Sequence, residues 1–358
     1  MANTFKTLTP NDKAVIRNML HESIPITGSI INTSSYSNNN IKNFSHGLFQ
    51  QVYDYPYLSS SANHILDITT GYSNRSALSS STNYLNKQKI NMYNQMAKVL
   101  VGVDPTGSVM EFDEDGDMTA GTKIREAVFI NFARLLTKDG IKKGSFTLEI
   151  GVGTNYHIPH SSRLYVKDAD GATSWKTNSP AGEYGILIAS NSVGVSSVTN
   201  EQCGLLYYQA GIAVLTASLF MGTGSGGIIP DSVDFTSGSI TPYAINMNST
   251  LTGSTLSGTA DGFRQRWYNC SFNNTIELNS LVHFVRIGHN EFNYSANPTY
   301  LTGSKIRVKN NAQDDPVSYI TTVGLYSDDN ELLAVGKLSE PLKKKPGEEI
   351  LIRTRLDT

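Results

Sequence analysis

The densest group of potential metal ligands in the sequence is the acidic run from Asp113 to Asp117, which contains Gly116. Carboxylates at alternate positions beside a glycine are typical of a calcium-binding loop. With Gly116 aligned on the loop's glycine, Glu111 stands first and Thr122 stands twelfth, so the closing bidentate glutamate is missing. We therefore expect a tight turn at Asp115-Gly116 and no metal site.

Two other segments contain residue types that bind ligands. Residues 222–227 are glycine-rich like a phosphate-binding loop, but no Lys-Ser/Thr pair follows, and Pro230 breaks a helix. His157 and His160 are the one close histidine pair, and Pro159 between them prevents a shared helical face. These patterns predict a flexible loop tip and exposed loop histidines.

Nucleophilic chemistry has no recognisable motif in this chain. The Gly-x-Ser-x-Gly elbow is missing, and scattered Ser, His and Asp residues carry no weight in a chain this rich in serine. A pair of catalytic carboxylates cannot be read from sequence. We expect no catalytic residue and no cofactor, and hence a protein that is not an enzyme.

The composition favours β-rich domains whose surfaces are covered by neighbouring chains. Only 17% of the 358 residues are charged, against about 25% in an average domain, and 18 tyrosines are present. Tyrosine is enriched at interfaces, whereas Lys and Glu are depleted there. The formal net charge of -2 leaves no basic field, which disfavours nucleic acid as a partner.

The chain shows no sign of export or membrane insertion. Residues 1–5 lack a basic segment followed by an apolar one, so we expect synthesis in the cytoplasm without a signal peptide. The longest apolar run, 211–221, is about half the length of a membrane span. Cys203 and Cys270 lie far apart, and we expect two buried thiols, as in a reducing cytosol.

Three segments of the N-terminal region have features of helices. The first begins with Thr9 as N-cap and Pro10 at the first position, and it continues to Leu20. The second, residues 85–101, is apolar on two sides and is therefore buried on two sides. The third begins at Thr122 and stops near Gly140. Its expected apolar seam is Ile124, Ala127, Val128, Leu135 and Leu136.

Residues 26–83 are mostly polar, contain several aromatic residues, and show no clean periodicity. An irregular segment of this length is unusual inside one compact domain. We expect an extended arm with short helical pieces that becomes ordered by contact with neighbours.

From residue 144 onward the pattern is that of β-strands. Alternating apolar residues predict strands at 146–150, 163–166 and 184–188, whereas residues 205–219 fit either a buried strand pair or a helix. Further strands are expected at 283–287, 304–308, 320–326, 331–338 and 349–356. Regular strand spacing of this kind suggests a sandwich or a partly open barrel.

These patterns together predict an α+β protein of three parts. Residues 1–143 form a helical N-terminal region with an extended arm at about 26–83. Residues 144–262 form a β-rich middle domain with a Gly/Ser-rich insertion at 222–262. Residues 263–358 form a C-terminal antiparallel β-sandwich or partly open barrel.

Five segments of the sequence are distinctive. Towards the C-terminus they are residues 288–300 (GHNEFNYSANPTY), 316–326 (PVSYITTVGLY) and 331–338 (ELLAVGKL). Towards the N-terminus they are residues 53–64 (YDYPYLSSSANH) and 91–97 (NMYNQMA). These segments resemble structural proteins of contractile-tailed bacteriophages related to the T4-like cyanophages. The resemblance concerns about half of the chain and implies a structural protein of the virion tail.

The resemblance implies a baseplate wedge protein that acts through protein–protein assembly, with a neck protein or a tail-fibre attachment protein as alternatives. Its partners would be other tail and baseplate proteins, copies of itself to form an oligomer, and in one alternative a tail fibre. Two other classes stay open, a virion-borne glycan hydrolase and a receptor-binding tip. The side chains expected at interfaces are Tyr53, Tyr55, Tyr57, Met92, Met96, Phe292, Tyr294, Ile350 and Ile352.

Overall fold

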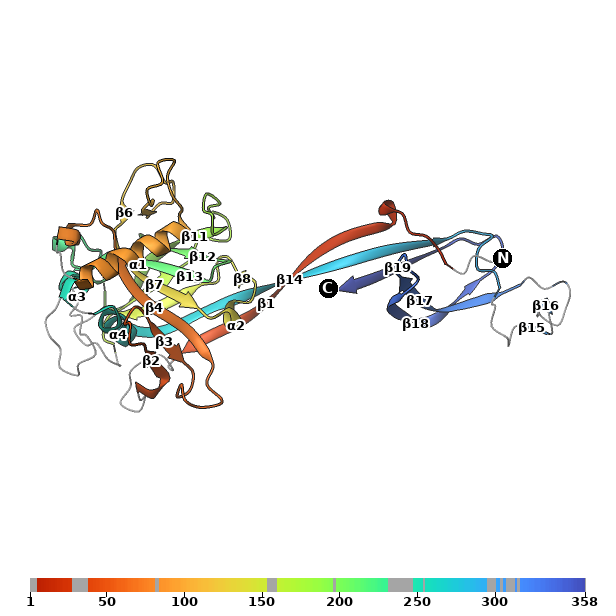
Figure 1. Cartoon of the computed structure of the whole chain (residues 1–358), viewed down its shortest axis with the longest axis horizontal. Helices are drawn as coiled ribbons and strands as arrows, with labels where there is room; N and C mark the ends of the chain where they lie inside the picture. The colour runs from red at the N-terminus through yellow and green to blue at the C-terminus, as the bar shows by residue number, and fades with distance from the viewer. Residues whose placement is uncertain are drawn as a thin grey trace. The chain divides into compact units, whose positions relative to one another are not determined.

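The computed structural model describes residues 5–27, 38–80, 84–152, 160–195, 198–230, 247–253, 255–294, 301–302, 305–306, 313 and 316–357 (Figure 1). The chain is mostly β-structure with few helices. It divides into two compact units. Unit 1 comprises Met1–Leu20 and Glu277–Thr358, and unit 2 comprises His21–Ile276.

Two long strands, β1 (Lys13–Thr27) and β14 (Trp267–Ile287), have residues in both units. The other strands of unit 2 are β2 (Ile41–Asn43), β3 (Gln50–Tyr53), β4 (His64–Tyr72), β5 (Phe112–Asp113), β6 (Lys123–Ile124), β7 (Glu126–Phe132), β8 (Gly140–Ile141), β9 (Thr147–Gly151), β10 (Arg163–Lys167), β11 (Tyr184–Val193), β12 (Glu201–Tyr207) and β13 (Ile212–Thr216). Its helices are α1 (Tyr84–Leu100), α2 (Arg134–Thr137), α3 (Met247–Gly253) and α4 (Leu256–Arg266). The other strands of unit 1 are β15 (Leu301–Thr302), β16 (Lys305–Ile306), β17 (Ser318–Tyr326), β18 (Leu332–Lys344) and β19 (Ile350–Asp357).

A 13-stranded antiparallel sheet is the main element of the fold, and it is not closed. Its strand order is β1-β14-β9-β10-β11-β12-β13-β7-β4-β3-β2, and β8 and β19 also pair with β14. Short hairpins connect neighbours such as β12 and β13, in which Leu205 lies opposite Val214. The expected antiparallel pairing is therefore confirmed, whereas the expected α+β class is not, since helices are few. The sheet is not closed.

The sheet of unit 2 is buried on both faces, as β7 illustrates. Val128, Ile130 and Phe132 belong to one apolar cluster, and Ala127 and Phe129 belong to the other. Helix α4 contributes Ala260 and Phe263 to the first cluster, and α1 contributes Tyr93, Ala97 and Leu100 to the second. Every residue of such a strand can be apolar, so the alternation of a half-exposed strand is lost.

Helix α1 agrees with the prediction for residues 85–101, and it packs closely on the sheet. Gly71 of β4 makes the close approach possible. A Cβ atom at Gly71 would lie 2.7 Å from the carbonyl oxygen of Lys89 and 2.9 Å from the backbone nitrogen of Tyr93. Only a glycine fits between this strand and this helix without a shift of backbone.

The prediction of a third helix, from Thr122 to about Gly140, is wrong. Residues 126–132 form β7, and the helical part is the single turn α2. Val128 and Ala127 of the expected seam point to opposite faces of the sheet, because neighbouring strand residues alternate. A short apolar run fits a helix or a strand that is buried on both faces, and periodicity alone does not separate the two.

The prediction of a helical N-terminal region is also wrong, because this region starts with a strand. Thr9 and Asp12 do interact as at the start of a helix, with the backbone nitrogen of Thr9 donating to Asp12 Oδ2 at 2.9 Å. That turn is a 3-10 helix of three residues, Pro10–Asp12, and β1 follows it directly. The apolar residues of β1 are spaced as in a helix, but hydrogen bonding of β1 to β14 stabilises the strand instead.

The segment expected as an extended arm contributes three strands to the sheet. β4 lies between β3 and β7, and its residues Leu66 and Ile68 are fully buried. Residues 38–80 are thus largely a folded part of unit 2. Residues 28–37 and 81–83 of the expected arm lie outside the described residues.

Downstream of residue 144 most strand predictions are confirmed, as β9, β10, β11, β17, β18 and β19 show. Residues 205–219 form a strand pair, β12 and β13, and not a helix. The segment 222–262 contains α3 and most of α4, and its residues 231–246 and 254 lie outside the described part of the chain. The two compact units have other bounds than the three expected domains.

Candidate functional site

Unit 1 exposes much of its apolar surface. Its large hydrophobic residues that are exposed are Phe5, Val15, Met19, Leu20, Tyr294, Tyr319, Tyr326, Leu332, Leu333, Val335, Leu342 and Leu351. The buried hydrophobic residues among its described positions are Val282, Ile287 and Ile352. Among the described residues of unit 1, the buried apolar core is therefore small for an isolated sheet.

The exposed residues gather at the β17–β18 hairpin. Tyr326 lies directly opposite Leu332, and Val335 lies opposite Gly324. A Cβ atom at Gly324 would lie 2.9 Å from the ring of Tyr326 and 3.3 Å from Leu332 Cδ1, so these side chains share one face. Phe5 adds its ring edge-on to Tyr326, with a centroid distance of 5.0 Å. We call Phe5, Tyr326, Leu332, Leu333 and Val335 the hairpin patch.

The sequence of the hairpin explains its geometry. Ser327 to Asn330 form the turn, in which the backbone nitrogen of Ser327 donates to the carbonyl oxygen of Glu331 at 2.8 Å. Asn330 adopts a left-handed conformation with φ 61°, which asparagine tolerates better than most residues. Val323 and Leu325 are half-buried, whereas Gly324 and Tyr326 are exposed. This period of two places alternate residues of β17 on opposite faces.

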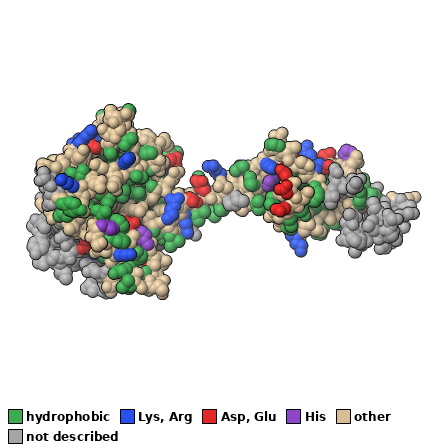
Figure 2. All heavy atoms as spheres, in the orientation of Figure 1, with side chains coloured by type: hydrophobic (Ala, Val, Ile, Leu, Met, Phe, Trp, Pro, Cys, Tyr) green, Lys and Arg blue, Asp and Glu red, His purple; other side chains and the backbone are tan. Residues whose placement is uncertain are grey.

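Charged side chains of both signs surround the hairpin patch. Asp328, Asp329 and Glu331 lie at the turn, and Lys337, Glu340 and Lys343 follow along β18. None of these six exposed residues forms an ion pair within the described part of the chain. Figure 2 shows acidic side chains gathered on one face of unit 1, with hydrophobic side chains beside them.

The structure distributes the expected interface residues over both units. Tyr53 ends β3, and Tyr55 and Tyr57 follow it on an exposed loop of unit 2. Met92 and Met96 are half-buried on α1, and Met96 packs against the Tyr93 cluster of the core. Tyr294 of unit 1 is exposed, and Phe292 beside it is half-buried.

Ile350 and Ile352 lie in β19, opposite Ile287 and Val285 of β14. Ile352 is buried, so its side chain contributes to the small core of unit 1. The hairpin patch was not among the expected interface residues. Its signal in the sequence is the pair of adjacent leucines, Leu332 and Leu333, directly after an acidic turn, where a half-exposed strand would alternate.

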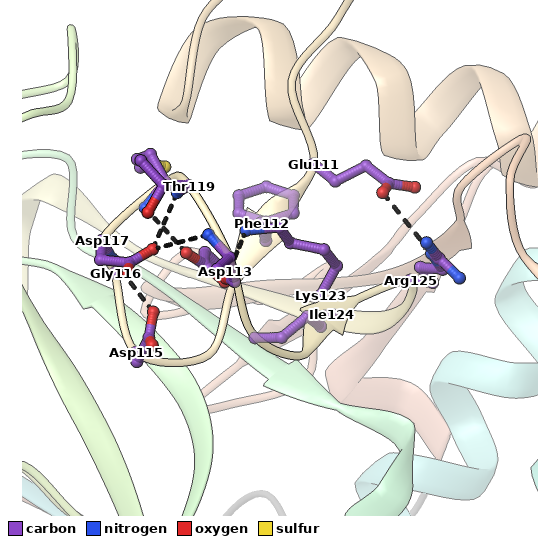
Figure 3. A network of polar contacts seen from close by, with 12 residues as sticks. Glu111, Phe112, Asp113, Asp115, Gly116, Asp117, Thr119, Lys123, Ile124 and Arg125 are labelled. Carbon is purple, nitrogen blue, oxygen red and sulfur yellow. Dashed lines mark hydrogen bonds and ion pairs between the residues drawn. The ribbon is translucent and has the colours of Figure 1, made fainter.

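The acidic loop brings together Asp113, Asp115 and Asp117, whose nearest carboxylate oxygens all lie within 4.8 Å of one another (Figure 3). This arrangement has Asp113 in the first position, not Glu111 as the alignment on Gly116 assumed. Carboxylates at this separation can hold a divalent cation in proteins. An acidic cluster does not by itself identify a metal site. Among the described residues, no other His, Cys, Asp or Glu side chain joins these three as a possible metal ligand.

Lys123 supplies a positive charge to the acidic loop. Its Nζ atom lies 2.9 Å from Asp113 Oδ1, and the backbone nitrogen of Met118 donates to Asp113 Oδ2 at 2.8 Å. Burial raises the pKa of Asp113 above its ordinary value, and these two partners oppose that shift. Burial also raises the pKa of Glu114 to about 7, with a further contribution from the charge of Asp113.

The histidine pair, the glycine-rich loop and the two cysteines are the other candidate ligand-binding residues of the sequence. His160 is buried, so the expectation of an exposed loop histidine is wrong for this residue, while His157 lies outside the described residues. Part of the glycine-rich loop forms a 3-10 turn, Thr223–Ser225. Cys203 and Cys270 are buried free thiols, as expected, and burial raises the pKa of both.

One pocket of about 240 Å³ lies between β2, β3 and the N-terminal turn of α4. Asn43, Gln50, Thr255, Ser257 and Asp261 give it a polar lining. Asp261 is its single carboxylate, and this residue is paired with Arg264.

Among the described residues, no helix combines the length and the hydropathy that a membrane crossing requires. No protein-family model, curated protein sequence or solved structure matches the chain.

Proposed function

We propose that the chain is a structural component of a bacteriophage virion, a baseplate wedge protein of a contractile tail that acts through protein–protein assembly. The observation that carries the proposal is the apolar surface of unit 1. Its exposed large hydrophobic residues outnumber its buried ones among the described positions. Contiguous apolar surface of this kind marks interaction sites in soluble proteins.

The place in the particle rests on the resemblance of residues 288–300, 316–326 and 331–338 to tail proteins of contractile phages. Two of these three segments form the β17–β18 hairpin, which carries most of the hairpin patch. Six of the twelve exposed large hydrophobic residues of unit 1 lie in these three segments, namely Tyr294, Tyr319, Tyr326, Leu332, Leu333 and Val335. A neck protein or a tail-fibre attachment protein would use the same surface in another position.

The proposal is tested on purified particles of the phage that encodes the chain. Mass spectrometry should detect the chain in intact particles, and gold-labelled antibodies against unit 2 should bind at the baseplate. Labelling at the neck or along fibres would replace the wedge assignment with one of the two alternatives. Its absence from particles that contain the other tail proteins would refute the proposal.

The glycan hydrolase alternative requires two carboxylates beside a substrate cleft. The pocket next to α4 offers Asp261 alone, held by Arg264. We therefore expect no cleared zone when the purified chain is run in a gel that contains host peptidoglycan. Clearing that is lost in Asp261→Asn would establish hydrolysis and overturn the assembly assignment.

A further inference from the structure

We propose that the pocket beside α4 binds one ring of a neutral sugar. The β2–β3 hairpin and the N-terminal half of α4 line this pocket, and all of its lining residues belong to unit 2. The inference therefore goes beyond the proposed assembly function and does not depend on the apolar surface of unit 1. Four features carry it: a buried amide oxygen without a partner, the polar groups of the lining, their charge balance and the size of the space.

Gln50 contributes a buried amide group that is only half satisfied. The residue is 1% exposed, and its Nε2 atom donates to Asn43 Oδ1 at 3.0 Å. Its Oε1 atom has no hydrogen-bond partner among the described residues. An acceptor left buried without a partner is destabilising, and Gln50 lines the pocket. A ligand with an O–H group in the pocket would supply the donor that this amide oxygen lacks.

The other lining residues offer both donors and acceptors. Asn43 is exposed, and because its Oδ1 atom accepts from Gln50, its Nδ2 group is left to donate to a ligand. Ser257 adds a hydroxyl group, and Asp261 adds a carboxylate that can accept from two hydroxyls. A ligand that satisfies this set has to donate and accept at neighbouring positions. The ring hydroxyls of a sugar do so, since each is a donor and an acceptor.

The charges at the pocket are balanced. Asp261 is the single charged residue among the described residues that line it, and its Oδ1 atom pairs with Arg264, which is 1% exposed. A cation would therefore compete with Arg264 for the same carboxylate, and an anion would be repelled by that carboxylate. A neutral ligand meets neither cost. With one carboxylate, the pocket would bind a sugar without hydrolysing it, since hydrolysis uses two.

The pocket has the size of one ring. Its volume of about 240 Å³ corresponds to about eight water molecules at roughly 30 Å³ each. Pockets for drug-sized ligands begin at about 300 Å³. A single sugar ring fits such a space, whereas the rest of an oligosaccharide would extend into solvent.

The loop between β2 and β3 is fixed by its own contacts. Phe44 and His46 stack with a centroid distance of 5.0 Å, and the ring of Phe49 lies 5.0 Å from that of Phe44. Thr69 Oγ1 donates to the carbonyl oxygen of Leu48 at 2.6 Å, which ties the loop to β4. Because this side of the pocket is formed before a ligand arrives, binding costs less conformational entropy.

The test is saturation-transfer NMR of the full chain with the methyl glycosides of glucose, galactose, mannose and N-acetylglucosamine. We expect at least one to bind with a Kd on the order of 1 mM, since a ring of about 12 non-hydrogen atoms makes few contacts. Gln50→Met should weaken binding about tenfold, because it removes the amide group and keeps the length of the side chain. Its stability should equal or exceed that of wild type, since an unpartnered buried group disappears. Circular dichroism establishes that the variant is folded.

Gln51→Met is the matched control. Gln51 is the next residue of β3, in which side chains alternate between the two faces, and it does not line the pocket. This variant should bind the sugar as tightly as wild type does. A chain that binds none of the four glycosides would overturn the inference, as would a Gln50→Met variant that binds as tightly as wild type.

Displacement of the bound sugar by inorganic phosphate or by Ca²⁺ would also overturn the inference, because the pocket would then select a charged ligand. Each of these outcomes leaves the proposed assembly function intact, since that function is tested by the presence of the chain in virions.

Discussion

The Nζ atom of Lys89 donates a hydrogen bond to the carbonyl oxygen of Leu251, and a second one, at 3.4 Å, to that of Thr250. A fully buried ammonium group thus ties α1 to the last turns of α3. Carbonyl groups at a helix C-terminus have no partner within the helix and carry partial negative charge, which favours a cation there. Residues distant in sequence are joined through one charged group.

Burial lowers the pKa of Lys89 to about 8, against 10.5 in the unfolded chain. The unfolded chain therefore binds more protons than the folded chain between about pH 8 and 10.5, so this group makes stability rise with pH in that window. We expect the free energy of unfolding in urea to rise between pH 8 and 10 in wild type, relative to Lys89→Met. Buried tyrosines contribute with opposite sign near pH 10 in both proteins and cancel in the difference. Parallel pH profiles of the two proteins would contradict the prediction.

Gly71→Ala should destabilise unit 2 by about 1–3 kcal/mol, the usual cost of overpacking. The new methyl group would lie 2.7 Å from the carbonyl oxygen of Lys89, and the helix backbone cannot move without disturbing its other contacts. The measurement is the midpoint of urea unfolding followed by circular dichroism. Gly224→Ala is the control, because nothing lies within 4 Å of its added Cβ atom. Equal midpoints for the two variants would show that α1 can shift away from β4.

How much of this fold the sequence predicts depends on how local the deciding interactions are. The helix at residues 85–101 and the strand at 320–326 were predicted because each carries its own period. β1 was predicted as a helix because its strand state depends on pairing beside β14, more than 200 residues away. β7 was predicted as a helix because burial on both faces removes its alternation.

The candidate sites are likewise predictable only where local sequence determines them. The sequence alone identifies the acidic run, but alignment on Gly116 puts Glu111 in the first position, whereas the structure brings together Asp113, Asp115 and Asp117. No local pattern indicates Lys123 as the partner of Asp113, because the two residues meet only through the pairing of β5 with β6. Exposure of Leu332 and Val335 became evident only with the surroundings of the hairpin.

Tyr208→Phe should destabilise the fold by about 1–3 kcal/mol at neutral pH, the cost of leaving a buried polar group without its partner. The Tyr208 hydroxyl donates to Asp168 at 2.9 Å from Oδ2, and the backbone nitrogen of Gly144 donates to the same carboxylate at 2.8 Å. Burial raises the pKa of Asp168, and the loss of the hydroxyl should raise it further. Thermal unfolding measures the loss, with Tyr55→Phe as control because Tyr55 is exposed. Similar melting temperatures for the two variants would contradict it.

Lys123→Met should destabilise unit 2 by about 1–3 kcal/mol at pH 7, because the buried carboxylate of Asp113 loses its counter-charge. Burial already raises the pKa of Asp113, and removal of Lys123 should raise it further. A carboxyl group with a raised folded pKa binds its proton more readily in the folded chain, so the penalty should shrink as pH falls through that pKa.

The double variant Lys123→Met with Asp113→Asn separates charge from packing. It removes the uncompensated charge and should recover most of the stability lost in Lys123→Met at pH 7. Lys6→Met is the control for a surface pair, since Lys6 and Glu291 are both about one-third exposed and their pair should contribute less than about 1 kcal/mol. Urea unfolding at pH 7 and pH 4 measures all four proteins. A loss in Lys123→Met that is equal at both pH values, and that Asp113→Asn does not relieve, would assign the role of Lys123 to packing of its aliphatic chain.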